Sequence, residues 1–218
     1  STQAQSDLIV QQFDKYYGVT PVVYTIPVGS LPELKYPSST RKPFSLITAS
    51  RLASEKHVDW ICKAVIQAHA EVPEVSLDIY GVGGEREKLE TIIRDNNASD
   101  YIYLMGQHDL SEVYQKYEAY IAGSTSEGFG LTLMEAVGGG LPIIGFDVRY
   151  GNPTFIRNGE NGYLINLPEE DKDRIEVLRK GIVDLFKQDL EKCHSVSYEV
   201  AKDFLTSNVQ EKWREAVC

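Results

Sequence analysis

Two glutamates flank a glycine-rich turn in the stretch Glu127-Gly-Phe-Gly-Leu-Thr-Leu-Met-Glu135. A carboxylate in the position of Glu135 can accept two hydrogen bonds from the hydroxyl groups of a ribose. Glu127, on the other side of the turn, would face the opposite end of the same ligand. Two carboxylates that bind hydroxyl groups, placed around one turn, suit a nucleotide sugar. Taken alone, the stretch also fits a plain glycine turn with two solvated glutamates.

The residues after the turn predict a short helix that can bind an anion. Residues 131–137 are good helix formers, and the glycines at 138–140 end the segment. The free N–H groups of Gly130, Leu131 and Thr132 would lie at the helix N-terminus. Unpaired donors and the positive end of the helix dipole attract a phosphate there.

A second pair of residues supplies positive charge. Arg51 and Lys56 lie in Ser50-Arg-Leu-Ala-Ser-Glu-Lys56, between a predicted strand and a predicted helix. The planar guanidinium of Arg51 and the compact ammonium of Lys56 could clamp a diphosphate. The alternative is that Arg51 pairs with Glu55 while Lys56 is solvated.

Strands and helices alternate through the middle of the chain. Apolar runs predict strands at 44–49, 75–80, 101–104, 119–122, 141–146 and 162–165. Helical spacing of apolar residues predicts helices at 57–72, 85–97, 110–117 and 131–137. This alternation predicts an α/β fold, a Rossmann-like doubly wound parallel sheet. Both candidate motifs fall at the carboxyl ends of its strands, where such sheets bind ligands.

The two ends of the chain have a different character. Residues 1–17 can form a helix, 22–26 a short strand, and 31–43, rich in proline, a surface linker. From Glu169 onward the pattern is helical. We therefore predict a remnant of a preceding domain with its linker at 1–43, a nucleotide-sugar-binding domain at 44–190 and a helical tail at 191–218. The absence of an initial methionine suggests a fragment or a processed form.

Composition excludes several classes of protein. The 218 residues carry a net charge of −10, which argues against nucleic acid or an anionic membrane as the main partner. No run approaches the roughly 20 apolar residues of a membrane span, and the N-terminal residues lack the basic and apolar regions of a signal peptide. We expect a cytoplasmic protein, with a peripheral position at the inner membrane face also open. The three cysteines form no CxxC pair, so neither a disulfide framework nor a zinc site is indicated, and Cys62 is expected in the core.

Together these motifs resemble the retaining GT-B glycosyltransferases of family 4. The resemblance rests on Arg51-x4-Lys56 and Glu127-x7-Glu135, and on Tyr80–Leu89, Met105-Gly106 and Asn158–Ile165, so it covers the chain from Ile26 to about Ile165. The sequence of residues 146–153 is similar to that of two branches of the family. One comprises the A subunits that place N-acetylglucosamine on serine-rich streptococcal and staphylococcal adhesins. The other comprises the poly(glycerol-phosphate) α-glucosyltransferases of wall teichoic acid.

The resemblance implies a role for each candidate residue. The catalytic set would be Arg51 and Lys56 at the pyrophosphate and Glu127 at the hydroxyl groups of the donor sugar. Glu135 would bind the ribose. The remaining contacts to the donor would come from Gly128 and Phe129 at the sugar, Gly130, Leu131 and Thr132 at the phosphates, and Met105, Gly106 and Gln107 at the base. No metal and no cofactor would be needed, and the donor would be a UDP-sugar.

In such enzymes the acceptor-binding half comes first, and nothing before Arg51 matches it. We therefore expect this chain alone to bind nucleotide without transferring sugar. The best reading of the whole protein is transfer of N-acetylglucosamine from UDP-N-acetylglucosamine to Ser or Thr of a serine-rich protein, with a second glycosyltransferase-like subunit as a possible partner. Alternatives are a teichoic acid α-glucosyltransferase, a non-catalytic partner subunit and a nucleotide-sugar 2-epimerase.

Two further motifs resemble metal-binding and dinucleotide-binding sequences. Asp171-Lys-Asp173 has the form of a metal-binding DxD, but carboxylates at a helix start are favoured by the dipole alone. Gly81-Val-Gly-Gly-Glu-Arg86 begins like a dinucleotide fingerprint and ends in arginine instead of glycine. Neither a metal-dependent transferase nor a nicotinamide enzyme is favoured.

Overall fold

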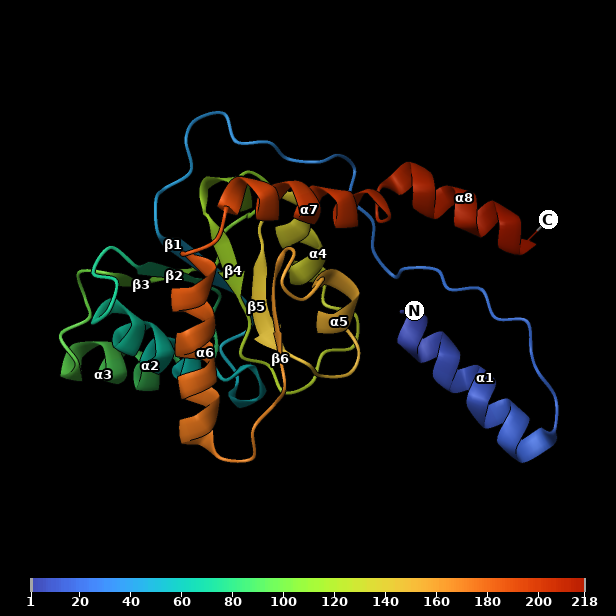
Figure 1. The fold of residues 1–218 in the computed structure, drawn as a ribbon, viewed down its shortest axis with the longest axis horizontal. Coiled ribbons are helices and arrows are strands. Elements are labelled where there is room, and N and C mark those ends of the chain that lie inside the picture. Colours follow the sequence, from blue (N-terminus) through green and yellow to red (C-terminus); the bar gives the residue numbers. More distant parts are fainter. Residues whose placement is uncertain (1, 218) are drawn as a thin grey trace.

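The fold is a six-stranded parallel sheet with helices on both faces, seen in a computed structural model that describes residues 2–217 (Figure 1). The strand order is β3-β2-β1-β4-β5-β6. The strands are β1 (Ser45–Ala49), β2 (Ser76–Tyr80), β3 (Ile102–Gly106), β4 (Ala119–Ile121), β5 (Ile143–Phe146) and β6 (Gly162–Ile165). This confirms the predicted doubly wound sheet. Ser1 and Cys218, which belong to the predicted end segments, lie outside the described residues.

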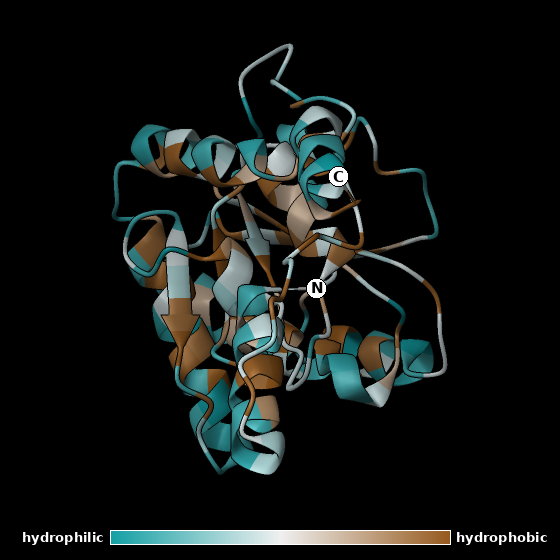
Figure 2. Cartoon of the chain, turned by 90° about the vertical axis from the view of Figure 1, so that its right-hand side faces the viewer, coloured by the Kyte–Doolittle hydropathy of each residue, from teal (hydrophilic) through white to brown (hydrophobic). Residues whose placement is uncertain are grey.

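Eight α-helices and two 3-10 turns accompany the strands within residues 2–217. The helices are α1 (Gln3–Tyr17), α2 (Val58–His69), α3 (Arg86–Asp95), α4 (Leu131–Gly138), α5 (Asn152–Phe155), α6 (Asp171–Leu185), α7 (Leu190–Lys202) and α8 (Thr206–Val217). The 3-10 turns are η1 (Ser54–Lys56) and η2 (Tyr114–Lys116). Most helices carry both apolar and polar stretches, as helices that cover a sheet must (Figure 2).

The sheet separates two apolar cores because successive side chains of a strand point to opposite faces. Leu46 and Ile144 face the core built with α2, α3 and α6. Ile47 and Ile143, their neighbours in the chain, face the core built with α4, α5 and α7. Every residue of β1 and β2 is buried, as expected for central strands covered on both faces. Cys62 lies in the first core, as predicted.

Two predicted elements were wrong. Residues 22–26 form no strand, because no other strand lies beside them, and Val22 and Tyr24 are exposed. Residues 110–117 form no α-helix, and the segment contains only the turn η2. The N–H groups of Val113, Lys116 and Tyr117 donate to carbonyls three positions earlier, and this tighter winding is typical of short connecting segments.

The predicted surface linker is partly buried, because Arg41 anchors it. Arg41 is 8% exposed, and its Nη1 donates to the carbonyl oxygens of Gln115 and Tyr117, both at 2.9 Å. Its Nη2 donates to the carbonyl oxygen of Gly139 at 2.9 Å. These bonds fasten residues 31–43 to η2 and to the end of α4.

Candidate functional site

A cleft of about 450 Å³ opens at the carboxyl edge of the sheet. Its lining comes from the loops that follow β1, β2 and β3, and from the first turn of α4. The lining residues are Ala49, Ser50, Arg51, Tyr80, Gly81, Val82, Gln107, His108, Leu110 and Thr132. The cleft therefore lies where the sequence predicted a ligand.

Lys56 and Glu127 form an ion pair at this edge, although 71 positions separate them in the chain. Their side chains are 19% and 17% exposed, so the pair is largely shielded from water. Ser124 donates a hydrogen bond from Oγ to Oε1 of Glu127 at 2.8 Å. Lys56 is therefore not a freely solvated cation, and the part of the alternative that concerns Lys56 is wrong.

A close approach of two loops makes this pair possible. Gly123 follows β4, and a Cβ atom at this position would lie 2.8 Å from the carbonyl oxygen of His57 and 3.0 Å from that of Lys56. Real Cβ atoms essentially never come so near backbone oxygen, so the two loops can pack in this way only with glycine at this position. The glycine thus brings the loop that carries Glu127 against the turn that carries Lys56.

Arg51 lies at the rim of the cleft and points to solvent. Its side chain is 78% exposed, and Nη2 pairs with Oε1 of Glu55 at 3.0 Å. This pairing is the one that the alternative reading of the sequence named. An exposed ion pair of this kind contributes little to stability, so turning the guanidinium toward a ligand costs little free energy. Its role as a phosphate clamp stays a prediction.

The N-terminus of α4 faces the same loops. Gly130 precedes the helix in the left-handed region, with φ of 87°, and its carbonyl accepts from the N–H groups of Leu133 and Met134. Within residues 2–217, no acceptor is found for the N–H groups of Leu131 and Thr132. Two backbone donors are thus available at the positive end of a helix dipole.

The loop between Glu127 and α4 is held from both sides. The N–H of Glu127 donates to the carbonyl of Arg149 at 3.0 Å, and the N–H of Gly151 donates to the carbonyl of Glu127 at 2.9 Å. The ring of Phe129 is buried against Phe155, with 5.5 Å between the ring centroids. The main chain of Phe129, and not its ring, can therefore line a ligand. The carbonyl of Gly128 accepts from Nε2 of Gln5, a residue of α1, at 3.4 Å.

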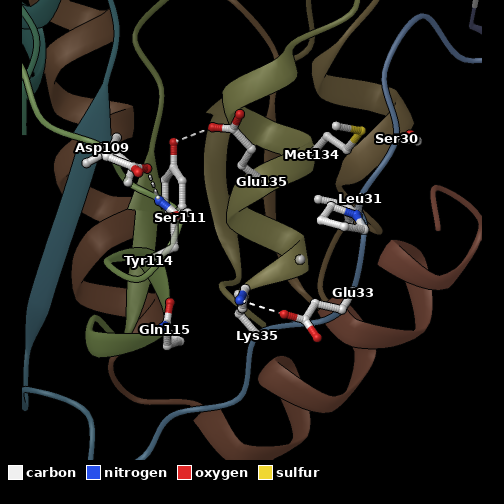
Figure 3. Close-up of a pocket in the computed structure, with 14 residues that line it drawn as sticks. Ser30, Leu31, Glu33, Lys35, Asp109, Ser111, Tyr114, Gln115, Met134 and Glu135 are labelled. Carbon is white, nitrogen blue, oxygen red and sulfur yellow. Dashed lines mark hydrogen bonds and ion pairs between the residues drawn. The ribbon is translucent and has the colours of Figure 1, made fainter. Parts of the chain in front are cut away.

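Glu135 lines a separate cavity of about 240 Å³ (Figure 3). The cavity lies between α4, η2 and the segment that begins at Ser30, and Leu110 lines both it and the cleft. The hydroxyl of Tyr114 donates to Oε2 of Glu135 at 2.9 Å. Desolvation raises the pKa of Glu135 above its usual value, and the hydrogen bond from Tyr114 partly offsets this. The structure thus brings Lys56 and Glu127 together, while Glu135 lines the neighbouring cavity.

The three residues predicted at the base lie at the end of β3. Gln107 lines the cleft, Met105 is 37% exposed, and the carbonyl of Gly106 accepts from the N–H of Gly81 at 2.7 Å. The carbonyl of Gly106 is therefore already engaged with the loop after β2.

Sequence reasoning missed two hydroxyl groups at the site, those of Ser124 and Tyr114. Ser124 lies three positions before Glu127 in a polar run, and that closeness is a signal that could have identified it. Nothing in the sequence around Tyr114 indicates a partner 21 positions away.

The remaining polar motif has a structural role. Asp171 and Asp173 lie in the first turn of α6, and Asp171 pairs with Arg174 at 2.9 Å. Among residues 2–217, no cluster of three or more His, Cys, Asp or Glu is arranged to hold a metal ion. In the same part of the chain, none of the helices combines the length and the apolar character needed to cross a membrane.

Comparison with known proteins gives one consistent family. The model of the family described as glycosyl transferases group 1 matches residues 35–203. The chain is 52% identical, over its whole length, to the UDP-N-acetylglucosamine–peptide N-acetylglucosaminyltransferase GtfA subunit of Streptococcus pneumoniae serotype 4. It is 32% identical over 177 residues, 80% of its length, to the poly(glycerol-phosphate) α-glucosyltransferase of Bacillus subtilis, of which it covers 26%.

Solved structures agree with the sequence comparison. The pneumococcal O-GlcNAc transferase GtfA in complex with UDP and GlcNAc superimposes on the whole chain with a TM-score of 0.93 at 51% identity. A GtfA/B complex gives the same TM-score of 0.93 over 99% of this chain and 44% of the other. The chain spans about 44% of the length of the pneumococcal relative in both comparisons. With a family model that matches most of its residues, the chain belongs to the group 1 glycosyl transferases.

Proposed function

We propose that this chain is the donor-binding half of a retaining GT-B glycosyltransferase of family 4. The whole protein would transfer N-acetylglucosamine from UDP-N-acetylglucosamine to Ser or Thr of a serine-rich protein. The observation that carries the proposal is the likeness over the full chain, at 51% identity, to a transferase solved with UDP and GlcNAc. The lower identity and coverage of the poly(glycerol-phosphate) α-glucosyltransferase make that acceptor the weaker candidate.

The chemistry that we assign to the site is electrostatic. Arg51, Lys56 and the free N–H groups at the start of α4 would stabilise the negative charge that develops on the departing diphosphate. Lys56 and the N–H groups of α4 would need little reorganisation, because other contacts already hold them in place, whereas Arg51 would turn from Glu55 toward the ligand. We propose that this set replaces a metal ion.

Glu127 would bind hydroxyl groups of the donor sugar. The ion pair with Lys56 supports this role, because it holds the carboxylate beside the cation that we assign to the phosphates. A donor in which the sugar is joined to a diphosphate needs these two groups side by side. Glu135 would bind the ribose from the neighbouring cavity.

The organisation of the whole protein is also a proposal. Residues 1–43 would connect to an acceptor-binding half, residues 44–190 would bind the donor, and residues 191–218 would form the helical tail. Since the chain spans under half of its relatives, we expect it to bind UDP without transferring sugar. A second glycosyltransferase-like subunit is proposed as a partner, because the matching structure is a complex of two subunits.

Calorimetric titration of the chain tests the donor site. We expect UDP and UDP-N-acetylglucosamine to bind, and NAD not to bind. Lys56→Ala and Arg51→Ala should each weaken UDP binding by about 1.5–3 kcal/mol, the size of a hydrogen bond to a charged group. Arg94→Ala, which removes an exposed arginine from α3, is the matched control and should leave the affinity unchanged. Equal UDP affinity in all four proteins would refute the assignment.

A further inference from the structure

The hydroxyl of Tyr114 is a buried donor directed at an exposed carboxylate. Tyr114 is 3% exposed, and its hydroxyl lies 2.9 Å from Oε2 of Glu135 (Figure 3). Burial raises the pKa of this hydroxyl far above its usual value. A tyrosine hydroxyl is protonated at neutral pH, so Tyr114 acts as the donor and the ionised carboxylate of Glu135 as the acceptor.

The backbone around Tyr114 is fixed by contacts from outside its own turn. Arg41 binds the carbonyls of Gln115 and Tyr117, one on the next residue and one at the end of η2. On another side the turn packs against α4, because a Cβ at Gly139 would lie 2.8 Å from the Cβ of Tyr114. The ring also packs near Tyr120, with 6.3 Å between centroids. The position of the hydroxyl is therefore set by the core and not by the ligand.

Glu135 has no comparable support of its own. Among residues 2–217, Tyr114 alone donates a hydrogen bond to this carboxylate, and no cation pairs with it. By contrast, Glu127 is held by both Lys56 and Ser124. A glutamate side chain that is free in solvent loses up to about 2 kcal/mol of rotamer entropy when a ligand fixes it. Any ordering of Glu135 before ligand binding therefore comes from Tyr114.

We propose that Tyr114 is the positioning residue for ribose recognition. Its hydroxyl holds Oε2 of Glu135, so that the remaining acceptor sites of the carboxylate are already oriented for the ribose hydroxyl groups. Tyr114 does not contact the nucleotide; it acts through Glu135. The inference rests on the proposed function, in which Glu135 binds the ribose.

The test compares two nucleotides that differ only in the groups that Glu135 would bind. UDP carries both ribose hydroxyl groups, and 2′,3′-dideoxyuridine diphosphate carries neither. Tyr114→Phe removes only the hydroxyl and keeps the ring in the core. We expect Tyr114→Phe to weaken UDP binding roughly three- to tenfold, the value of one hydrogen bond, and to leave dideoxy-UDP binding unchanged. Tyr103→Phe, which removes an exposed hydroxyl from β3, should change neither affinity.

The comparison separates the possible failures. If Tyr114→Phe weakens both nucleotides equally, or neither, its role is only structural and the proposal is overturned. Glu135→Gln should also reduce the preference for UDP over dideoxy-UDP, and adding Tyr114→Phe to it should cause little further loss. If Glu135→Gln lowers the preference but Tyr114→Phe does not, the proposal fails while the ribose assignment stands. If the unaltered chain binds the two nucleotides equally, or binds no UDP, the proposal for Tyr114 and the ribose assignment of Glu135 fail together.

Discussion

The two glutamates of the central motif have the same chemistry and opposite environments. Glu127 is shielded and paired with a cation, so its charge is neutralised by Lys56. Glu135 has a neutral tyrosine as its donor, and desolvation raises its pKa. A carboxylate with a raised pKa is less stable as an anion in the folded state than in the unfolded chain. The ionised carboxylate at the Glu135 end of the motif therefore lowers the stability of the folded state.

This difference predicts how stability depends on pH. The folded-state pKa of Glu135 lies above its unfolded value, so the ionised group lowers stability above that pKa, and this cost vanishes below the unfolded pKa of about 4.3. Glu135→Gln should therefore raise the melting temperature at neutral pH, and the gain should shrink as the solution is acidified. Thermal melts at several pH values measure this. Glu112→Gln is the control of opposite sign, because a hydrogen bond from Lys35 lowers the pKa of Glu112. A gain for Glu135→Gln that persists at acid pH would contradict the argument.

At the scale of elements, the cleft depends on a close contact between the loops after β1 and β2. The N–H of Ser50 donates to the carbonyl of Tyr80 at 3.0 Å, and the N–H of Leu52 donates to that of Val82 at 2.9 Å. Gly81 lies between these bonds with φ of 135°, and a Cβ there would be 1.8 Å from the carbonyl oxygen of Ser50. Arg51 is thus carried on a loop whose path requires glycine in the neighbouring loop.

We expect Gly81→Ala to displace the loop that carries Arg51 and to weaken UDP binding at least tenfold. Stability should also fall, by about 1–3 kcal/mol, because the loop must move and the new residue has a disfavoured φ. Gly84→Ala is a matched control in the same loop, since a Cβ there meets no atom within 4 Å. Titration calorimetry and thermal melts measure both effects. Similar behaviour of the two variants would show that the contact does not shape the cleft.

The sequence predicts most of the elements but not the contacts between them. All six strands and the long helices follow from apolar periodicity, which is a local property. The error at residues 22–26 arose because β propensity does not reveal whether a neighbouring strand exists. The shared location of Lys56 and Glu127 was predictable, since parallel strands end at one edge. The link from Tyr114 to Glu135 depends on how η2 packs against α4, which a single sequence does not show, whereas the link from Ser124 to Glu127 spans only three positions.

At the scale of the whole molecule, the helix α1 is set apart from the sheet (Figure 1). Of the residues of α1, Ser6 is the buried one, and Phe13 and Tyr17 are 43% and 72% exposed. In contrast, α7 buries Cys193, His194, Ser197, Val200 and Ala201. Few buried contacts mean a low free energy of local opening.

Hydrogen exchange measured by mass spectrometry should therefore distinguish fast-exchanging from slow-exchanging parts of the chain. Peptides from α1 should exchange well before those from β1, β2 and α7, because α1 can open without the sheet. Peptides from the central strands should exchange only through global unfolding. The exchange of α8, which buries Val209, should resemble that of α1. Protection of α1 equal to that of the strands would contradict this picture.

The anchoring of Arg41 has a consequence for the time course of folding. Its guanidinium binds carbonyls that lie 74, 76 and 98 positions further along the chain. Contacts so distant in sequence close large loops, and their entropic cost is met only after local contacts have formed. The carbonyls that Arg41 binds belong to η2, to the residue after it and to the end of α4, so we expect residues 31–43 to dock only after these elements have formed. An interaction formed after the folding transition state slows unfolding more than it speeds folding. We therefore expect Arg41 to affect how long the native state lasts more than how quickly it forms.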